Sequence, residues 1–334
     1  MVNIARNCVV CDRLTSDFSY GVDCCNACKM FFRRHIIDGT PLKTCLTGDQ
    51  NCDQEKLIGC QLCRFHKCLL SGMVFLPLLQ KTTLENIIDN VNQLNVQRKK
   101  SLYHSYPVDK NLTVSSILFL KNIVYVNRNI DDEPLDFYKW SYISTVSTIE
   151  FLKSLVFVYL AKHEDQLNIV KSSFLSTASL FAAFRACSAK QHMLTFPDGL
   201  DIFPLTLKPL VPNLNELETR IRCRLVGKLH EIKLKYEELL LVLVVIICNP
   251  ALPNLTETGK ILLSSYQNHY SSSLLQYCMQ TYQRFGPTRY TELLSIINVL
   301  SKHCEDVNNY FVILQLNNID SQLHDIVREG IETL

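Results

Sequence analysis

Cysteines crowd the amino-terminal part of this chain, and their spacing constrains its fold more than any other feature. Ten of the 15 cysteines lie between Cys8 and Cys68. Two Cys-x-x-Cys pairs can bring four sulfurs to one metal and close a tetrahedral thiolate shell with bonds of about 2.3 Å. The spacing predicts two sets of four ligands: Cys8, Cys11, Cys25 and Cys28, then Cys45, Cys52, Cys60 and Cys63. We therefore expect two structural Zn²⁺ ions, whose binding stabilises a short segment that lacks an apolar core.

Disulfide bonds are the competing interpretation of this cluster. Residues 1–7 lack the apolar core of a signal peptide, so entry into an oxidising compartment is not expected. The other five cysteines are scattered singly through apolar stretches, where they are interpreted as small buried hydrophobes. Metal ligation is therefore favoured over disulfides.

Composition and motifs also bear on the class of function. The longest uninterrupted apolar run, Leu239–Cys248, has ten residues, whereas a bilayer span needs about 20. We expect a buried helix there and no membrane partner. The nine histidines are dispersed, and the sequence has no HExxH motif, glycine-rich phosphate loop or GxSxG motif. Catalysis is therefore not expected.

The segment after the second cysteine pair predicts a helix with two different faces. Lys29 and Arg33 stand four residues apart and share one side, with Arg34 adjacent. Phe31 and Phe32 supply an apolar face. A zinc-anchored helix of this kind can place its cations in the DNA major groove while its aromatic residues hold it to the zinc module. A solvated basic face on a ubiquitin-ligase or adaptor zinc domain is the alternative that spacing alone leaves open.

Two longer motifs resemble the DNA-binding domain of nuclear receptors. They are YGVDCCNACKMFFRRHI and CQLCRFHKCLLSGM, and with the cysteine spacing they cover about the first 73 residues. The resemblance implies that the helix from about Cys25 reads a hexameric half-site of double-stranded DNA. It assigns base discrimination to Asn26, Ala27 and Met30, base contacts to Lys29 and Arg33, and phosphate contacts to Arg34, Arg64 and Lys67.

The second cysteine set departs from the usual pattern of that family. The loop from Cys45 to Cys52 is longer than usual, and the stretch from Cys52 to Cys60 is shorter and lacks the usual basic run. Fewer phosphate contacts mean weaker and less salt-sensitive DNA binding. Such irregular second modules resemble those of the nematode branch of the family.

A polar segment separates the cysteine-rich part from the rest of the chain. We expect a zinc-dependent DNA-binding domain at 1–75, a linker at 76–107 with one amphipathic helix, and a helical domain at 108–334. Apolar residues recur at helical spacing from Leu217 to Leu243, which predicts one long helix. Strand patterns are confined to a small hairpin, at Leu194–Phe196 and Ile202–Leu205.

The helical domain carries resemblances of its own. IEFLKSLVFVYLAKHEDQLNIVK, residues 149–171, resembles the signature of the nuclear-receptor ligand-binding domain, and its spacing fits two packed helices joined near Lys162 and His163. GPTRYTELL, residues 286–294, resembles the start of the helix used for receptor dimerisation. The predicted fold class is thus a small α zinc module plus an all-α layered ligand-binding domain with at most a small β-hairpin. The implied partners are a lipophilic small molecule and a second receptor subunit, as homodimer or heterodimer.

Coregulator proteins are a further partner that the resemblance implies. Lys153 falls at the place of the lysine of a coactivator charge clamp, and Glu329, in the terminal segment IVREGI, would be its partner. Opposite charges at the two ends of an apolar groove cap the orphan backbone groups of an incoming leucine-rich helix. Lys171 is a third coregulator-binding candidate, and Gly330 departs from the apolar residue usual there. Two solvated surface charges are the alternative interpretation.

Arg185 lies in the apolar segment LFAAFRACSA, at the position where acid-binding receptors hold a ligand carboxylate. A buried arginine is rare without an anion, so a fatty-acid-like ligand is one hypothesis. An internal ion pair with an aspartate or glutamate is the alternative.

These features together predict a ligand-regulated, sequence-specific transcription factor in the nucleus. The nuclear location follows from the function, because the basic run at 98–100 is too short to be a convincing import signal. The main alternative is a receptor-derived interaction protein with weakened or lost DNA binding that acts through its helical domain. A ligand-independent regulator with a filled pocket is a further alternative.

Overall fold

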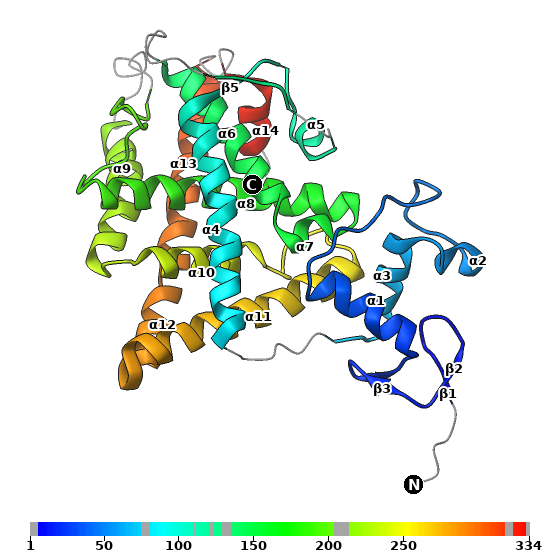
Figure 1. The fold of residues 1–334 in the computed structure, drawn as a ribbon. Helices are drawn as coiled ribbons and strands as arrows, with labels where there is room; N and C mark the ends of the chain where they lie inside the picture. The colour runs from blue at the N-terminus through cyan, green and yellow to red at the C-terminus, as the bar shows by residue number, and fades with distance from the viewer. Residues whose placement is uncertain are drawn as a thin grey trace.

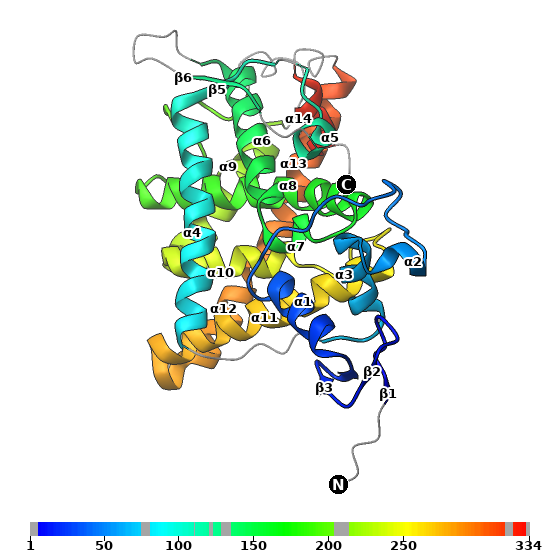
Figure 2. The same cartoon turned by 45° about the vertical axis from the view of Figure 1, so that its right-hand side comes forward.

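The chain folds into two lobes of unequal size. The computed structural model describes residues 6–74, 81–109, 111–119, 123–127, 135–203, 214–317 and 323–331. Figure 1 shows the small amino-terminal lobe beside a larger body of stacked helices, and Figure 2 shows the same arrangement from the side. The small lobe holds the cysteine cluster, so we call it the zinc module.

Two short hairpins and three helices build the zinc module. The hairpins pair β1 (Arg6–Asn7) with β2 (Leu14–Thr15) and β3 (Phe18–Ser19) with β4 (Val22–Asp23). The helices are α1 (Asn26–Ile36), α2 (Gln54–Leu57) and α3 (Gln61–Leu70). Phe32 of α1 stacks on Phe65 of α3 with ring centroids 5.9 Å apart, and Tyr20 meets Phe32 edge-on at 5.2 Å. Aromatic packing between α1 and α3 thus forms the small core that accompanies the zinc sites.

The large lobe is built around α8. Its helices are α4 (Lys81–His104), α5 (Val114–Phe119), α6 (Phe137–Lys153), α7 (Val156–Tyr159), α8 (His163–Ser188), α9 (Leu214–Glu231), α10 (Tyr236–Ile247), α11 (Glu257–Tyr282), α12 (Gly286–Leu294), α13 (Ile296–Leu316) and α14 (Asp325–Ile331). A 3-10 turn, η2 (Gln283–Phe285), joins α11 to α12. Helix α8 contacts α6, α9, α10 and α13. It is long and apolar enough to cross a membrane, but 56% of its most apolar window is buried inside the protein, as in the core helix of a globular domain.

The predicted fold class is confirmed, with one unpredicted hairpin in the large lobe and two in the zinc module. Strands in the described part of the large lobe are limited to the antiparallel pair β5 (Ser105–Pro107) and β6 (Tyr125–Asn127) and an isolated bridge between Thr195 and Asp201. That bridge lies within the hairpin expected at 194–205, of which residues 204 and 205 lie outside the described residues. The apolar run at 239–248 lies in α10 except for Cys248, and all of it but Ile246 is buried, as expected.

The segment expected to be a linker is largely one long helix. Helix α4 has 24 residues and packs against α6, α10 and α11. Its buried residues Leu84, Ile87 and Val91 face that body, and Asn95 donates a hydrogen bond to the Tyr236 hydroxyl at 2.9 Å. The polar composition of the segment is explained by its other side, which is exposed to solvent. Packing of one narrow apolar stripe is therefore enough to fix this helix.

The long helix expected from Leu217 to Leu243 is instead two helices. Helix α9 ends at Glu231 and α10 begins at Tyr236. Between them, Lys233 adopts a left-handed backbone with φ of 49°. The apolar repeat continues across the break because both helices bury their apolar residues in the same core, which is why the repeat predicted one helix.

Candidate functional site

The first four predicted zinc ligands converge at the start of α1. The Sγ atoms of Cys8, Cys11, Cys25 and Cys28 all lie within 4.8 Å of one another, and those of Cys11 and Cys25 are 3.6 Å apart. A tetrahedral site with Zn–S bonds of about 2.3 Å has sulfur–sulfur edges of about 3.8 Å, so the set fits Zn²⁺. The Asp12 amide donates a hydrogen bond to the Cys8 carbonyl oxygen at 2.9 Å, which closes the turn that carries the first pair.

The second four ligands converge beside α3 in the same way. Their Sγ atoms lie within 4.8 Å of one another, and Cys45 is 3.6 Å from both Cys52 and Cys63. Asp53 caps α2 by accepting a hydrogen bond from the Lys56 amide at 3.1 Å, which closes the short stretch between Cys52 and Cys60. Four thiolates leave no open coordination position, so both sites are structural. The prediction of two four-cysteine zinc sites is confirmed.

Helix α1 presents its polar side to solvent. Asn26, Ala27, Met30, Arg33 and Arg34 are exposed and Lys29 is half-buried. The opposite side, which includes Phe31 and Phe32, is buried in the zinc module. Six of the eight residues predicted to meet DNA therefore share one open surface on α1, which we call the reading face.

Arg64 of α3 has a role that the sequence did not reveal. Its Nη2 donates a hydrogen bond to the Sγ of the zinc ligand Cys28 at 3.2 Å, and its guanidinium lies 4.4 Å from the centre of the Phe31 ring. It thus ties α3 to α1, besides the phosphate contact predicted for it. Lys67, one turn later on α3, is half-buried.

The zinc module is docked on the helical body. The Tyr266 hydroxyl of α11 donates a hydrogen bond to the Ile36 carbonyl at the end of α1, at 2.9 Å. His66 of α3 lies with its Nε2 3.1 Å from the Leu160 carbonyl oxygen, and burial lowers the pKa of His66 to about 4. These contacts use the carboxyl-terminal end of α1 and His66 of α3, and they leave the reading face open.

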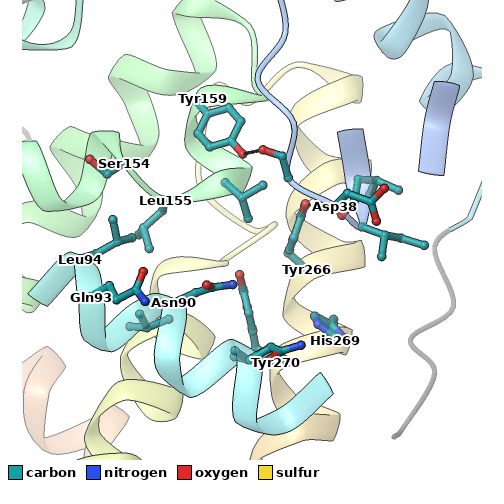
Figure 3. Close-up of a pocket in the computed structure, with 17 residues that line it drawn as sticks. Asp38, Asn90, Gln93, Leu94, Ser154, Leu155, Tyr159, Tyr266, His269 and Tyr270 are labelled. Carbon is teal, nitrogen blue, oxygen red and sulfur yellow. Dashed lines mark hydrogen bonds between the residues drawn. The ribbon is translucent and has the colours of Figure 1, made fainter. Parts of the chain in front are cut away.

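A cleft of about 710 Å³ opens along this junction (Figure 3). Its walls come from the loop after α1, from α4, from α7 and from α11, with Asp38, Asn90 and Tyr270 among the lining residues. Tyr159 of α7 donates a hydrogen bond to the Gly39 carbonyl across the cleft. No sequence motif marks the cleft, because its walls come from segments far apart in the chain.

A smaller cavity of about 170 Å³ lies among the helices of the body and is open rather than enclosed. Residues of α6, α8, α9, α13 and α14 and of the 194–203 segment line it, and they are mostly apolar. Phe174, Leu194, Tyr310 and Val327 are examples. Arg185 does not line this cavity; its guanidinium donates a hydrogen bond to the Thr195 carbonyl. Burial lowers the pKa of Arg185.

Lys153 and Glu329 are both brought to α5. The Lys153 ammonium donates a hydrogen bond to the Ile117 carbonyl oxygen at 2.7 Å, and the Glu329 carboxylate accepts one from the Val114 amide at 2.9 Å. The two charges therefore stand at opposite ends of one short helix. Lys171 is half-buried on α8.

Gly330 has a packing role on α14. A Cβ atom at this position would lie 2.8 Å from a ring carbon of Phe174, so only glycine lets α14 approach α8 this closely. Glycine therefore replaces the apolar residue usual at this position because α8 leaves no room for a side chain. The helix itself is retained and spans Asp325–Ile331.

Asp165 and Glu238 are two structural residues of the large lobe that the sequence did not single out for these roles. Asp165 is fully buried and accepts a hydrogen bond from the Thr256 amide at 2.8 Å, which holds the start of α11 against α8. Arg289 of α12 forms a buried ion pair with Glu238 of α10. Hydrogen bonds from Arg289 and Tyr282 to Glu238 keep the pKa of that carboxyl below its usual value despite burial.

Comparisons with known families match both lobes. A family described as a C4-type double treble clef zinc finger matches residues 6–75, and one described as the ligand-binding domain of nuclear hormone receptors matches residues 134–317. The second match alone covers more than half of the chain.

Individual relatives match over almost the whole length. Nuclear hormone receptor family member nhr-167 of Caenorhabditis elegans is 39% identical over 98% of this chain and 97% of its own length. Family member nhr-27 of the same organism is 34% identical over 99% of this chain and 94% of its own length. This family consists of transcription factors and not enzymes, as the sequence predicted for this chain. The chain belongs to the nuclear hormone receptor family, with a C4 zinc-finger DNA-binding domain and a helical ligand-binding domain.

Proposed function

We propose that this receptor is a ligand-regulated transcription factor that reads hexameric half-sites in the DNA major groove and recruits coregulators in the nucleus. The observation that supports half-site reading most directly is the reading face of α1. Lys29 and Arg33 lie on the open surface of α1. The first zinc site fixes the start of this helix, and the Phe32–Phe65 contact packs its opposite side against α3. Such a helix can enter the groove without rearranging its module.

The test is fluorescence anisotropy of the full chain on duplexes that carry a receptor half-site or a scrambled sequence, across a salt series. We expect zinc-dependent preference for the half-site. Replacing Lys29 or Arg33 by alanine should remove about 1–3 kcal/mol of that preference, because each good base contact contributes about that much discrimination. Lys302→Ala, which removes an exposed charge from α13, is the matched control and should leave the preference unchanged.

Equal, weak binding to both duplexes would contradict half-site reading. It would favour the alternative of an interaction protein that acts through its helical domain. The acidic Asp53–Gly59 stretch of the second module fits that alternative, because it lacks a basic run that could contact phosphates. We expect the affinity for DNA to depend only weakly on salt concentration while the preference for the half-site is retained, since that stretch offers few phosphate contacts.

Ligand regulation is proposed on the cavity of about 170 Å³ in the helical body. Its apolar lining fits a lipophilic molecule, although ligand pockets more often measure about 300–1,000 Å³. A fatty-acid-like ligand would need a wider cavity, and Arg185 would have to exchange the Thr195 carbonyl for the carboxylate. Native mass spectrometry of the folded protein with and without an added fatty acid tests this. Unchanged binding in Arg185→Leu would remove Arg185 from the ligand site.

Coregulator binding is proposed on Lys153, Glu329 and Lys171, and dimerisation on the α12 segment. The coregulator proposal is supported by the positions of Lys153 and Glu329, which bind the two ends of the short helix α5. The resemblance of residues 286–294 to the family's dimerisation helix supports the dimerisation proposal. The nuclear location follows from a DNA target.

A further inference from the structure

Helix α5 is held at both ends by Glu329 and Lys153, two of the three residues proposed to bind coregulators. The Val114 amide, one of the orphan donors at the amino end of α5, donates its hydrogen to Glu329 at 2.9 Å. At the other end, the Ile117 carbonyl oxygen accepts a hydrogen bond from Lys153 at 2.7 Å. A carboxylate at the start and an ammonium at the end match the polarity of a helix.

The sequence of α5 has the pattern of a helix bound in an apolar groove. Val114, Ile117 and Leu118, at positions i, i+3 and i+4, are at most 6% exposed. Ser115, on the other side, is exposed. Helix-in-groove recognition uses this arrangement of apolar anchors. In this chain the groove is formed by α6, α8 and α14, all of which α5 contacts.

The segment that carries α5 is tethered at its base. Strands β5 and β6 pair with each other on either side of it, and the Val108 amide donates to the Val124 carbonyl at 3.0 Å. The Tyr142 hydroxyl of α6 donates to the Asp109 carbonyl, which fixes the same base to the body. Figure 2 shows α5 beside α14, below the β5–β6 pair. These contacts hold the base of the segment without involving α5 itself.

We infer that α5 is a built-in competitor for the coregulator site, a helix that occupies the groove in cis and must leave before a partner helix with the same apolar spacing binds in trans. The inference rests on the coregulator function proposed above. A tether of a few residues gives an effective concentration of about 1 mM. If α5 itself binds the open groove with an intrinsic dissociation constant of about 10 µM, its competition weakens the apparent binding of a partner helix by about 100-fold.

The test measures binding of a fluorescein-labelled peptide with the sequence of residues 111–119 to the full chain. Ile117→Asp on the chain places a charge in the groove and should expel α5, since an unpaired buried carboxylate is costly. We expect this variant to bind the peptide about 100-fold more tightly than the unmodified chain. Ser115→Asp, on the exposed side of the same helix, is the matched control and should bind as weakly as the unmodified chain.

Two charge reversals identify the site of binding. Adding Lys153→Glu or Glu329→Lys to Ile117→Asp should abolish the gain, because each removes one end of the clamp. Half-site DNA binding and the melting temperature, measured on every variant, verify that the chain is folded. If Ile117→Asp unfolds the chain, hydrogen exchange on the unmodified protein takes the place of the binding test on that variant. Excess unlabelled peptide should then raise the exchange rate of the α5 amides.

The outcomes separate this inference from the function on which it rests. Equal binding to the unmodified chain and to Ile117→Asp would overturn the competitor role of α5 and leave the coregulator function standing. Absence of peptide binding to folded Ile117→Asp would overturn both. In the exchange experiment, peptide binding that leaves α5 protected would overturn the inference alone.

Discussion

Gly330 sits where α14 comes closest to α8, and the effect of a larger side chain there can be measured. Alanine normally stabilises a helix by about 1 kcal/mol relative to glycine. At Gly330 a Cβ would lie 2.8 Å from the Phe174 ring, so we expect Gly330→Ala to lower the free energy of unfolding by about 1–3 kcal/mol. Urea denaturation of the full chain measures it.

Gly227 of α9 offers the matched control for that substitution. It is exposed, and nothing lies within 4 Å of a Cβ built there. Gly227→Ala should therefore raise the free energy of unfolding by about 0.5–1 kcal/mol. If both variants shift stability in the same direction, close packing of α14 is not the reason for glycine at 330.

At the scale of elements, the helices of the zinc module depend on metal in a way that those of the body do not. Helix α1 has 11 residues and α3 has 10, lengths at which an isolated helix is marginal in water. We expect chelation to remove amide protection from α1 and α3 while α8 and α10 keep theirs, as measured by hydrogen exchange. Persistent protection of α1 after complete zinc removal would contradict this.

Single cysteine substitutions refine that experiment. Cys8→Ser should reduce the number of zinc ions bound per chain from two to one in native mass spectrometry, because it removes one of the first four ligands. Cys187→Ser, on α8 and outside both ligand sets, should leave two. Two zinc ions in Cys8→Ser would mean that the first site tolerates another ligand.

The elements that could be predicted from the sequence are those fixed by local spacing. Zinc ligation depends on cysteines a few residues apart, and the junction at Lys162 and His163 was predicted where α8 begins. The break between α9 and α10 could not be predicted, because Lys233 carries a left-handed backbone without a glycine or asparagine to signal it. Helix α5 is only six residues long, so its position depends on contacts with α6, α8 and α14 that no local pattern contains.

At the scale of the whole molecule, the two lobes meet through buried side chains that include a histidine whose protonation can be varied. Burial lowers the pKa of His66 to about 4, so the docked lobes keep it neutral, whereas an exposed histidine titrates near 6.5. The docked state is therefore favoured fully above about pH 6.5, and this contribution is lost as pH falls towards 4. His269 of α11, on the same cleft, has its pKa lowered to about 4 by burial as well.

Acidification should therefore loosen the contact between lobes. From the titration of His66 alone, we expect the ratio of docked to undocked chains to fall about tenfold between pH 7.5 and pH 5.5. Small-angle scattering, through the radius of gyration, and hydrogen exchange at α3 and α11 measure the change. His66→Asn removes one titrating group and should flatten the pH dependence; an unchanged profile in that variant would assign the effect to other groups.

Helix α14 contacts both the cavity and α5: its Val327 lines the cavity, and its Glu329 accepts a hydrogen bond from Val114 of α5. Two binding events at one short helix share a single coupling free energy, and thermodynamic reciprocity makes that coupling equal in both directions. A ligand that multiplies the affinity for a coregulator peptide by some factor must gain the same factor in its own affinity when the peptide is present. The strength of an unidentified ligand's control over transcriptional partners can therefore be measured from the partner side, by titrating peptide and measuring the change in the dissociation constant of the ligand.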